Sequence, residues 1–334
     1  MVRCMTTVWR LAATSVTLLA LLAAGDRLVA GAVGQSAEWR HGTQNPRQRI
    51  LWDREDDGSR VVIVGDSVLA SCYVNTPAQT LWARLEARLG APVFPAALDG
   101  ATPADLLLVA RRVAARWPAG TIALVGVHPA RIFVDEGPVP ETSRYEAWLD
   151  DGSSPFASRL GPFLADHVFL VGRYERLQEY FHGTLATEAT YYGAGVNRDR
   201  HWKDDGFARW RFDDLARVLE AGGAHRLLSR LDWIDAIDAE LRRGGLRPVF
   251  VLTPLNQAQL HEHAAGHERV PEMLAASRAR LLERLEGRGH EFIDLYTALD
   301  AAAFADLIHP NVRGDDGLAA ALAAALRGER RATP

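Results

Sequence analysis

The stretch Val61-Val62-Ile63-Val64-Gly65-Asp66-Ser67 is the part of the sequence that decides the fold. Its first half is a continuous β-branched run, which is typical of a strand buried on both faces of a parallel sheet. Strand-like runs recur at 92–96, 121–125, 248–252 and 291–295. Helical patterns separate most of these runs, and such alternation predicts an α/β protein with a three-layer, doubly wound parallel sheet.

A second informative stretch is Asp306-Leu307-Ile308-His309-Pro310. A serine at the end of a strand and a distant Asp-x-x-His pair are the parts of a Ser-His-Asp relay, which is recognised by roles and not by chain order. In this interpretation Ser67 is the nucleophile, His309 is the general base and Asp306 orients the imidazole. The carboxyl ends of parallel strands share one edge of the sheet. Residues predicted to gather there are Ser67, Gly100, Gly126, Asn256 and the loop that carries Asp306 and His309.

These segments resemble the SGNH (GDSL-type) hydrolase family. Gly65-Asp66-Ser67 is similar to its first block and Asp306–Pro310 to its last, in the right order. Leu98-Asp99-Gly100-Ala101-Thr102-Pro103 is similar to the second block, whose glycine amide helps to form the oxyanion hole. The resemblance spans about residues 60–325. It implies a flavodoxin-like sheet and a serine esterase or acyltransferase that forms an acyl-Ser67 intermediate.

The chain departs from this family at the third block, Gly-x-Asn-Asp. Its expected place reads Gly126-Val127-His128-Pro129. The resemblance therefore implies oxyanion donors at the amides of Ser67 and Gly100, with the third donor left open. Asn256 is favoured because it follows a predicted strand and carries an amide, and His128 is the alternative.

The N-terminus has the features of an export signal. Arg3 and Arg10 precede an apolar run from Leu11 to Ala24, and Ala30-Gly31-Ala32 offers a cleavage site. Residues 1–32 are therefore interpreted as a signal peptide or as an uncleaved anchor in the inner membrane. Either reading places the remaining chain outside the cytoplasm, in the periplasm or secreted. Residues 33–58 are polar and are interpreted as a linker or arm.

Residues 59–330 are predicted to form the catalytic domain, with an insertion of helices and loops at about 133–224. An aromatic segment at 191–212 could stack on sugar rings or pack the insertion. A local cluster comprises His261, Glu262, His263 and His267. It is interpreted as a solvated surface, because no further carboxylate or cysteine completes a ligand set. No metal and no other cofactor is expected.

The chain has 334 residues and a formal net charge of −4, with no run of basic residues, so nucleic-acid binding is not expected. The favoured function is an extracytoplasmic esterase or acyltransferase on O-acyl carbohydrate, similar to alginate O-acetyltransferase-type enzymes. Such a protein would bind an acylated carbohydrate or another ester, and would work beside a membrane-bound acyltransferase. The alternatives are a lipid or small-ester hydrolase and a catalytically silent carbohydrate-binding protein. Cys72 is interpreted as a small buried residue, with a second nucleophile as the alternative.

Overall fold

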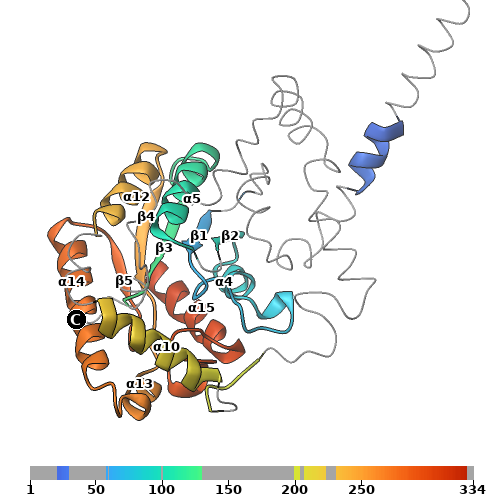
Figure 1. Cartoon of the computed structure of the whole chain (residues 1–334). Coiled ribbons are helices and arrows are strands. Elements are labelled where there is room, and N and C mark those ends of the chain that lie inside the picture. Colours follow the sequence, from blue (N-terminus) through green and yellow to red (C-terminus); the bar gives the residue numbers. More distant parts are fainter. Residues whose placement is uncertain are drawn as a thin grey trace, which may run out of the picture.

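The computed structural model describes residues 21–29, 58, 60–98, 101–129, 199–203, 207–222 and 231–328 (Figure 1). Most of the predicted signal segment, nearly all of the predicted arm, much of the predicted insertion and Gly100 lie outside these residues. Residues 21–29 are helical. Within the described ranges, no helix combines the length and the apolar character needed to cross a membrane.

A sheet of five parallel strands forms the centre of the described fold. The strands are β1 (Val61–Gly65), β2 (Val93–Ala97), β3 (Ile122–Val127), β4 (Arg247–Leu252) and β5 (Phe292–Asp294). Their spatial order is β2-β1-β3-β4-β5. This is the strand order of flavodoxin-like sheets. The chain places β2 on one side of β1 and the later strands on the other side, so the direction of winding reverses between β1 and β3. The predicted α/β fold with a doubly wound parallel sheet is confirmed.

Helices cover both faces of the sheet (Figure 1). One face carries α4 (Leu81–Leu89) and α15 (Val312–Leu326), and it receives the side chains of Val61 and Ile63. The opposite face receives Val62 and Val64. Its helices are α5 (Pro103–Arg116), α10 (Phe207–Gly222), α12 (Asp232–Arg243) and α14 (Arg269–Gly287). Adjacent residues of β1 thus enter two different cores, which explains why the run is apolar without alternation.

Local sequence accounts for most helix ends. The Thr102 hydroxyl accepts from the Asp105 amide, and Asp105 accepts in return from the Thr102 amide, so α5 begins with a capping box. The sequence also predicts a helix that starts at Thr76-Pro77. The structure has a short 3₁₀ turn there, η1 (Pro77–Gln79), and α4 begins only at Leu81, capped by Thr80. The Gln79 side chain accepts from the amide of Thr76 and closes the earlier turn.

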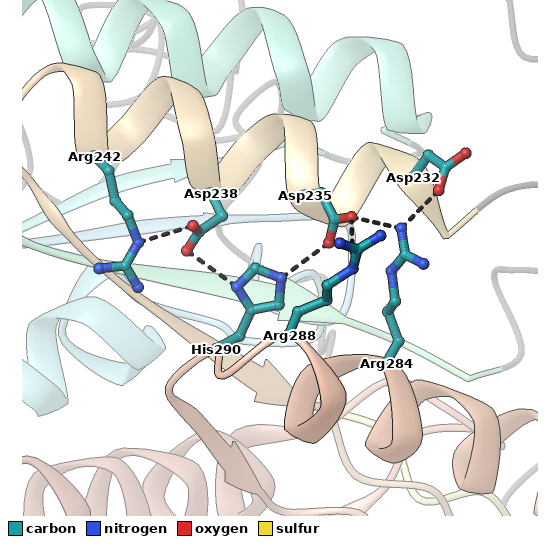
Figure 2. A network of polar contacts seen from close by, with 7 residues as sticks. All are labelled: Asp232, Asp235, Asp238, Arg242, Arg284, Arg288 and His290. Atoms are coloured by element: carbon teal, nitrogen blue, oxygen red, sulfur yellow. Dashed lines mark hydrogen bonds and ion pairs between the residues drawn. The ribbon is translucent and has the colours of Figure 1, made fainter.

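Charged side chains join α12 to the end of α14 and the turn before β5 (Figure 2). His290 lies between Asp235 and Asp238, with Nε2 at 3.0 Å from Asp235 and Nδ1 at 3.3 Å from Asp238. Arg284 pairs with Asp232 and Asp235. Burial raises the pKa of Asp235, but hydrogen bonds from His290 and Arg284 outweigh it and lower that pKa. The network ties the two helices that cover β4 and β5.

Two glycines shape the sheet edge where the winding reverses. A Cβ atom on Gly126 of β3 would lie 2.5 Å from Leu69 Cδ1, and one on Gly65 of β1 would lie 2.9 Å from it. Real Cβ atoms do not approach this closely, so any larger residue would displace Leu69. The glycines let the turn that follows β1 lie directly on the sheet, and this turn carries Ser67.

Candidate active site

Tight turns, and no regular helix, follow β1 at residues 66–72. The Asp66 carboxylate accepts from the Val68 amide at 3.0 Å, and the Asp66 carbonyl accepts from the Leu69 amide at 3.1 Å. The Ser67 carbonyl accepts from the Ala70 amide and from the Cys72 thiol. These bonds hold Ser67 in a compact turn at the carboxyl end of β1. Its side chain and backbone together are 7% exposed.

The Asp306–His309 loop is also held by its own backbone. Asp306 Oδ1 accepts from the amides of Ile308 and His309, each at 2.9 Å. The Leu307 carbonyl accepts from the Asn256 amide, which ties this loop to the carboxyl end of β4. The loop therefore presents the imidazole of His309 in one orientation.

The structure brings the three predicted residues into one hydrogen-bonded chain. His309 Nε2 lies 2.9 Å from Ser67 Oγ, and His309 Nδ1 lies 2.7 Å from Asp306 Oδ2. His309 and Asp306 are 3% and 1% exposed. These are the distances at which a base can take the serine proton and a carboxylate can orient the base. They join residues from opposite ends of the described domain.

The charge on Asp306 fixes the direction of this chain of hydrogen bonds. Burial raises the pKa of Asp306, but the charge of His309 and hydrogen bonds from His309 and Ile308 outweigh burial and lower that pKa to about 2. The group is therefore a carboxylate at neutral pH, and Nδ1 of His309 donates to it. Nε2 is left as the acceptor that faces the Ser67 hydroxyl.

Tyr73 and Cys72 flank the relay, and the sequence pattern had not singled out Tyr73. The Tyr73 ring lies 5.5 Å from the His309 ring, and Tyr73 pairs with Asn311 as an isolated parallel bridge. Cys72 is partly exposed, and its Sγ lies 3.5 Å from the Ser67 carbonyl. It is therefore less buried than the sequence interpretation expected.

Residues 199–203, which lie in the predicted insertion, contact the chain that follows the Ser67 turn and the chain that follows His309. The Asp199 amide donates to Asn75 Oδ1 at 3.3 Å, on the chain that follows the Ser67 turn. Asp199 Oδ1 accepts from the Val312 amide at 3.1 Å, at the start of α15. The Arg200 carbonyl accepts from Asn311 Nδ2 at 2.9 Å. We refer to 199–203 as the clamp segment, because it bonds to the chain after Ser67 and the chain after His309.

Asn256, the favoured third oxyanion donor, lies where the sequence places it and also caps the helix that follows. It follows β4 and is the N-cap of α13 (Gln257–His263), with Oδ1 accepting from the Gln259 amide at 3.1 Å. The whole residue is buried, and within the described residues its Nδ2 has no hydrogen-bond partner. The cap uses Oδ1 alone, so it does not occupy the amide nitrogen.

His128, the alternative donor, follows β3 directly and is buried at the same edge of the sheet as Ser67. Gly100 lies outside the described residues. Near it, the Leu98 amide donates to the Gly65 carbonyl at 2.8 Å and continues the pairing of β1 with β2. The oxyanion donors therefore remain predictions.

The histidine cluster packs against the aromatic segment, so its interpretation as a solvated surface is wrong for His263. His263 is buried against Trp202 and Phe212, and His267 Nδ1 lies 3.2 Å from Glu220. Trp210 is 57% exposed, whereas Trp202 and Phe212 are packed inside. No group of three His, Cys, Asp or Glu residues in the described ranges could hold a metal ion.

Comparison with protein families finds no matching family, and comparison with curated proteins finds no match. Two similar solved structures come from bacteria. The first, a proposed acylhydrolase from Bacteroides fragilis NCTC 9343, has a TM-score of 0.41 and 13% identity over 86% of this chain and 95% of its own. The second, a proposed arylesterase from Agrobacterium tumefaciens str. C58, has a TM-score of 0.39 and 15% identity over 80% of this chain and 98% of its own. At this similarity, the function of this chain has to be argued from its own residues.

Proposed function

We propose that this chain is a serine esterase or acyltransferase that forms an acyl-enzyme on Ser67. One observation carries the proposal, namely the 2.9 Å approach of His309 Nε2 to Ser67 Oγ on a histidine whose Nδ1 is held by Asp306. A serine at the end of a strand, without these partners, would indicate no more than a turn. A buried serine, histidine and carboxylate in this order support nucleophilic catalysis.

The reaction follows from this arrangement. Ser67 Oγ attacks the ester carbonyl carbon while His309 Nε2 takes the hydroxyl proton, and Asp306 stabilises the imidazolium that forms. The bond between the carbonyl carbon and the alcohol oxygen then breaks, and His309 returns the proton to that oxygen. Water or a sugar hydroxyl next attacks the acyl-Ser67 carbonyl, again through His309 as base, and releases the acid or a new ester.

Charge develops on the carbonyl oxygen during both attacks and has to be stabilised. The amides of Ser67 and Gly100 are the proposed donors, with His128 or Asn256 as the third. Preorganised donors of this kind lower the barrier by about 3–4 kcal/mol each.

For the substrate, we propose an O-acylated carbohydrate outside the cytoplasm, either in the periplasm, secreted, or reached from a membrane anchor. The support is the export-like N-terminus, with its basic start, apolar run and Ala30-Gly31-Ala32, together with the resemblance to alginate O-acetyltransferase-type enzymes. A membrane-bound acyltransferase is the partner that this proposal implies.

Active-site labelling tests the chemistry. A fluorophosphonate should label the purified chain at Ser67, and p-nitrophenyl acetate should be cleaved. Ser67→Ala should lose both activities with an unchanged circular dichroism spectrum. Cys72→Ala is the matched control, since it removes the neighbouring candidate nucleophile and should keep both. Labelling at Cys72, or an unchanged rate in Ser67→Ala, would overturn the proposal.

The acceptor is tested by product analysis. The chain is incubated with p-nitrophenyl acetate and an alginate oligosaccharide, and the products are resolved by mass spectrometry. An oligosaccharide heavier by one acetyl group indicates transfer, and free acetate alone indicates hydrolysis. Release of acetate from an acetylated polysaccharide supports the carbohydrate proposal. Preference for long-chain esters over p-nitrophenyl acetate and acetylated polysaccharide would favour the lipid hydrolase. Binding of oligosaccharide without any labelling of Ser67 would favour a catalytically silent binding protein.

A further inference from the structure

The loop that carries His309 is closed at its base by the side chain of Asn311. This asparagine lies two residues after His309 and is 5% exposed. Its Nδ2 atom donates to the Arg200 carbonyl at 2.9 Å and to the Ala302 carbonyl at 3.0 Å, with the Phe304 carbonyl at 3.4 Å. The proposed reaction gives Asn311 no role.

Backbone hydrogen bonds form a stem below this loop. The Asn311 amide donates to the Ala303 carbonyl at 3.0 Å, and the Ala305 amide donates to the His309 carbonyl at 2.9 Å. An antiparallel bridge lies between these two bonds, so the chain before Asp306 runs beside the chain that starts at His309. We refer to the paired segments as the stem, which comprises 303–305 and 309–311.

The hydrogen bonds at the two ends of the loop have different consequences. At the tip, Asp306 Oδ1 accepts from the amides of Ile308 and His309, and these bonds orient the imidazole on the carboxylate. At the stem, the Asn311 side chain bonds to the opposite side of the stem and to the clamp segment. The second set therefore decides where the tip lies in the fold.

Asn311 is also the point at which the chain after the nucleophile reaches the stem. Tyr73, six residues after Ser67, pairs with Asn311 as a parallel bridge. The bond to the Arg200 carbonyl adds the clamp segment to the same point. One buried residue thus contacts the stem, the clamp segment and the chain that follows Ser67.

The two ends of the Asn311 amide have separate partners. Oδ1 accepts from the Gly314 amide at 3.1 Å and caps α15. Serine and aspartate cap helices about as well as asparagine, so the cap alone does not require an amide. Only the NH₂ end can donate to carbonyls, and the reverse orientation would set an oxygen against three carbonyl oxygens. The cap therefore explains Oδ1 but not Nδ2.

The first turn of α15 lies directly on the stem. A Cβ atom on Gly314 would collide with the Ala303 carbonyl oxygen and would lie 2.7 Å from Pro310 Cβ. Real Cβ atoms do not approach other atoms this closely. The stem and the start of α15 are therefore packed as one unit, and Asn311 lies at their junction.

We propose that Asn311 is a positioning residue, whose Nδ2 group holds the tip of the loop where His309 can take the proton of Ser67. The effect on rate rests on the proposed function, whereas the effect on the loop does not. Loss of the Nδ2 hydrogens should leave the contact between His309 and Asp306 intact, because that contact lies within the tip. It should weaken the approach of His309 Nε2 to Ser67 Oγ.

Asn311→Ser separates the two ends of the amide, since serine keeps a cap oxygen and lacks the Nδ2 group. Its kcat for p-nitrophenyl acetate should fall about 10- to 100-fold with little change in KM, because a small misplacement of a reacting group is costly. Asn311→Ala should have the same kcat as Asn311→Ser. Its Tm should be lower than that of Asn311→Ser by about 2–4 °C, because it also loses the cap.

The Nδ1 proton of His309 gives a readout that a general loss of structure would not reproduce. A proton held between an imidazole and a carboxylate resonates far downfield in the proton NMR spectrum, and isotope-labelled histidine together with Asp306→Asn identifies it. In Asn311→Ser this resonance should persist while kcat falls. That combination would show a tip that is intact but displaced from Ser67.

Leu241→Val is the control for stability, because Leu241 is a fully buried residue of α12 in the core on the face of the sheet opposite α15. It should lower the Tm and keep kcat and KM. An unchanged kcat in Asn311→Ser, or an equal loss of kcat in Leu241→Val, would overturn the positioning role. Disappearance of the Nδ1 resonance in Asn311→Ser would overturn it as well.

Asn311→Asp takes the place of Asn311→Ser if the smaller serine prevents folding, because aspartate has the size of asparagine and keeps the cap oxygen. Its kcat should fall at least as far, since its second oxygen faces carbonyl oxygens. If neither variant folds, Asn311 is required for the whole fold, and a role limited to position is overturned. Activity that survives Ser67→Ala would instead reject the proposed function and leave the NMR comparison interpretable.

Discussion

Tyr73 packs against the imidazole of His309, with the ring centroids 5.5 Å apart and the ring planes at 57°. Tyr73 and His309 come from turns at opposite ends of the described domain. A parallel bridge between Tyr73 and Asn311 holds the backbones of these two turns side by side. An aromatic ring beside an imidazole restrains its rotation and favours its charged form. The proposed reaction passes through that charged form, so the contact should matter more to the transition state than to the resting protein.

Removal of the Tyr73 ring should therefore lower kcat more than it changes KM. Tyr73→Ala should reduce kcat by about 3- to 30-fold, which corresponds to about 0.5–2 kcal/mol of lost stabilisation. Tyr73→Phe keeps the ring and should keep most of the rate. Steady-state kinetics on p-nitrophenyl acetate measure both, and equal losses in the two variants would assign the effect to the hydroxyl.

The carboxylate of Asp306 should be required for rate across the working pH range. Asp306→Asn cannot hold the imidazolium and should lower kcat by about 10³- to 10⁴-fold. Since the folded pKa of Asp306 lies near 2, below its ordinary 3.8, its contribution to stability is complete above about pH 4 and is lost as pH falls toward 2. Denaturation curves of the wild type and Asp306→Asn at pH 2 to 6 check this, and Asp300→Asn, an exposed aspartate paired with Arg313, is the control.

Gly126 should be irreplaceable because of its contact with Leu69. Gly126→Ala places a methyl group against Leu69 and should cost about 1–3 kcal/mol of stability through overpacking. The displaced turn should also lower kcat. Leu69→Ala lowers stability by itself but makes room for the new methyl group. The loss of stability in the double variant should therefore be smaller than the sum of the two single losses. Strict additivity in urea denaturation would show that the two residues do not interact.

The third oxyanion donor is tested by ranking two variants. The Asn256 side chain caps α13 and is buried, so Asn256→Ala should lower stability by about 1 kcal/mol. Its Nδ2 has no hydrogen-bond partner within the described residues, so Asn256→Ala should also carry the larger loss of kcat, about 10²- to 10³-fold. The reverse ranking in kcat would transfer the role to His128. Near-wild-type kcat in both would leave the two backbone amides as the donors.

Much of this fold was predictable from the sequence, because buried parallel strands leave continuous apolar runs. The predicted strands agree with β1 to β5 within about two residues, and Thr102-Pro103 marks the start of α5. The start of α4 was misplaced because Thr80 also caps well, and only the tertiary structure selects between two nearby caps.

The proximity of Ser67, His309 and Asp306 was predictable as well, because these residues lie in short motifs of fixed spacing. The contacts around them were not predictable. Tyr73 and Asp199 contact segments far away in sequence, and such contacts leave no period or motif. The helix cap that Asn256 makes was not predictable either, since the sequence does not show which polar group a turn asparagine contacts.

The clamp segment (199–203) is hydrogen-bonded both to the chain after Ser67 and to the chain after His309. Asp199 bonds to Asn75 on one side and to Val312 on the other. A displacement of residues 199–203 would therefore be transmitted to the chain after Ser67 and to the chain after His309 at the same time.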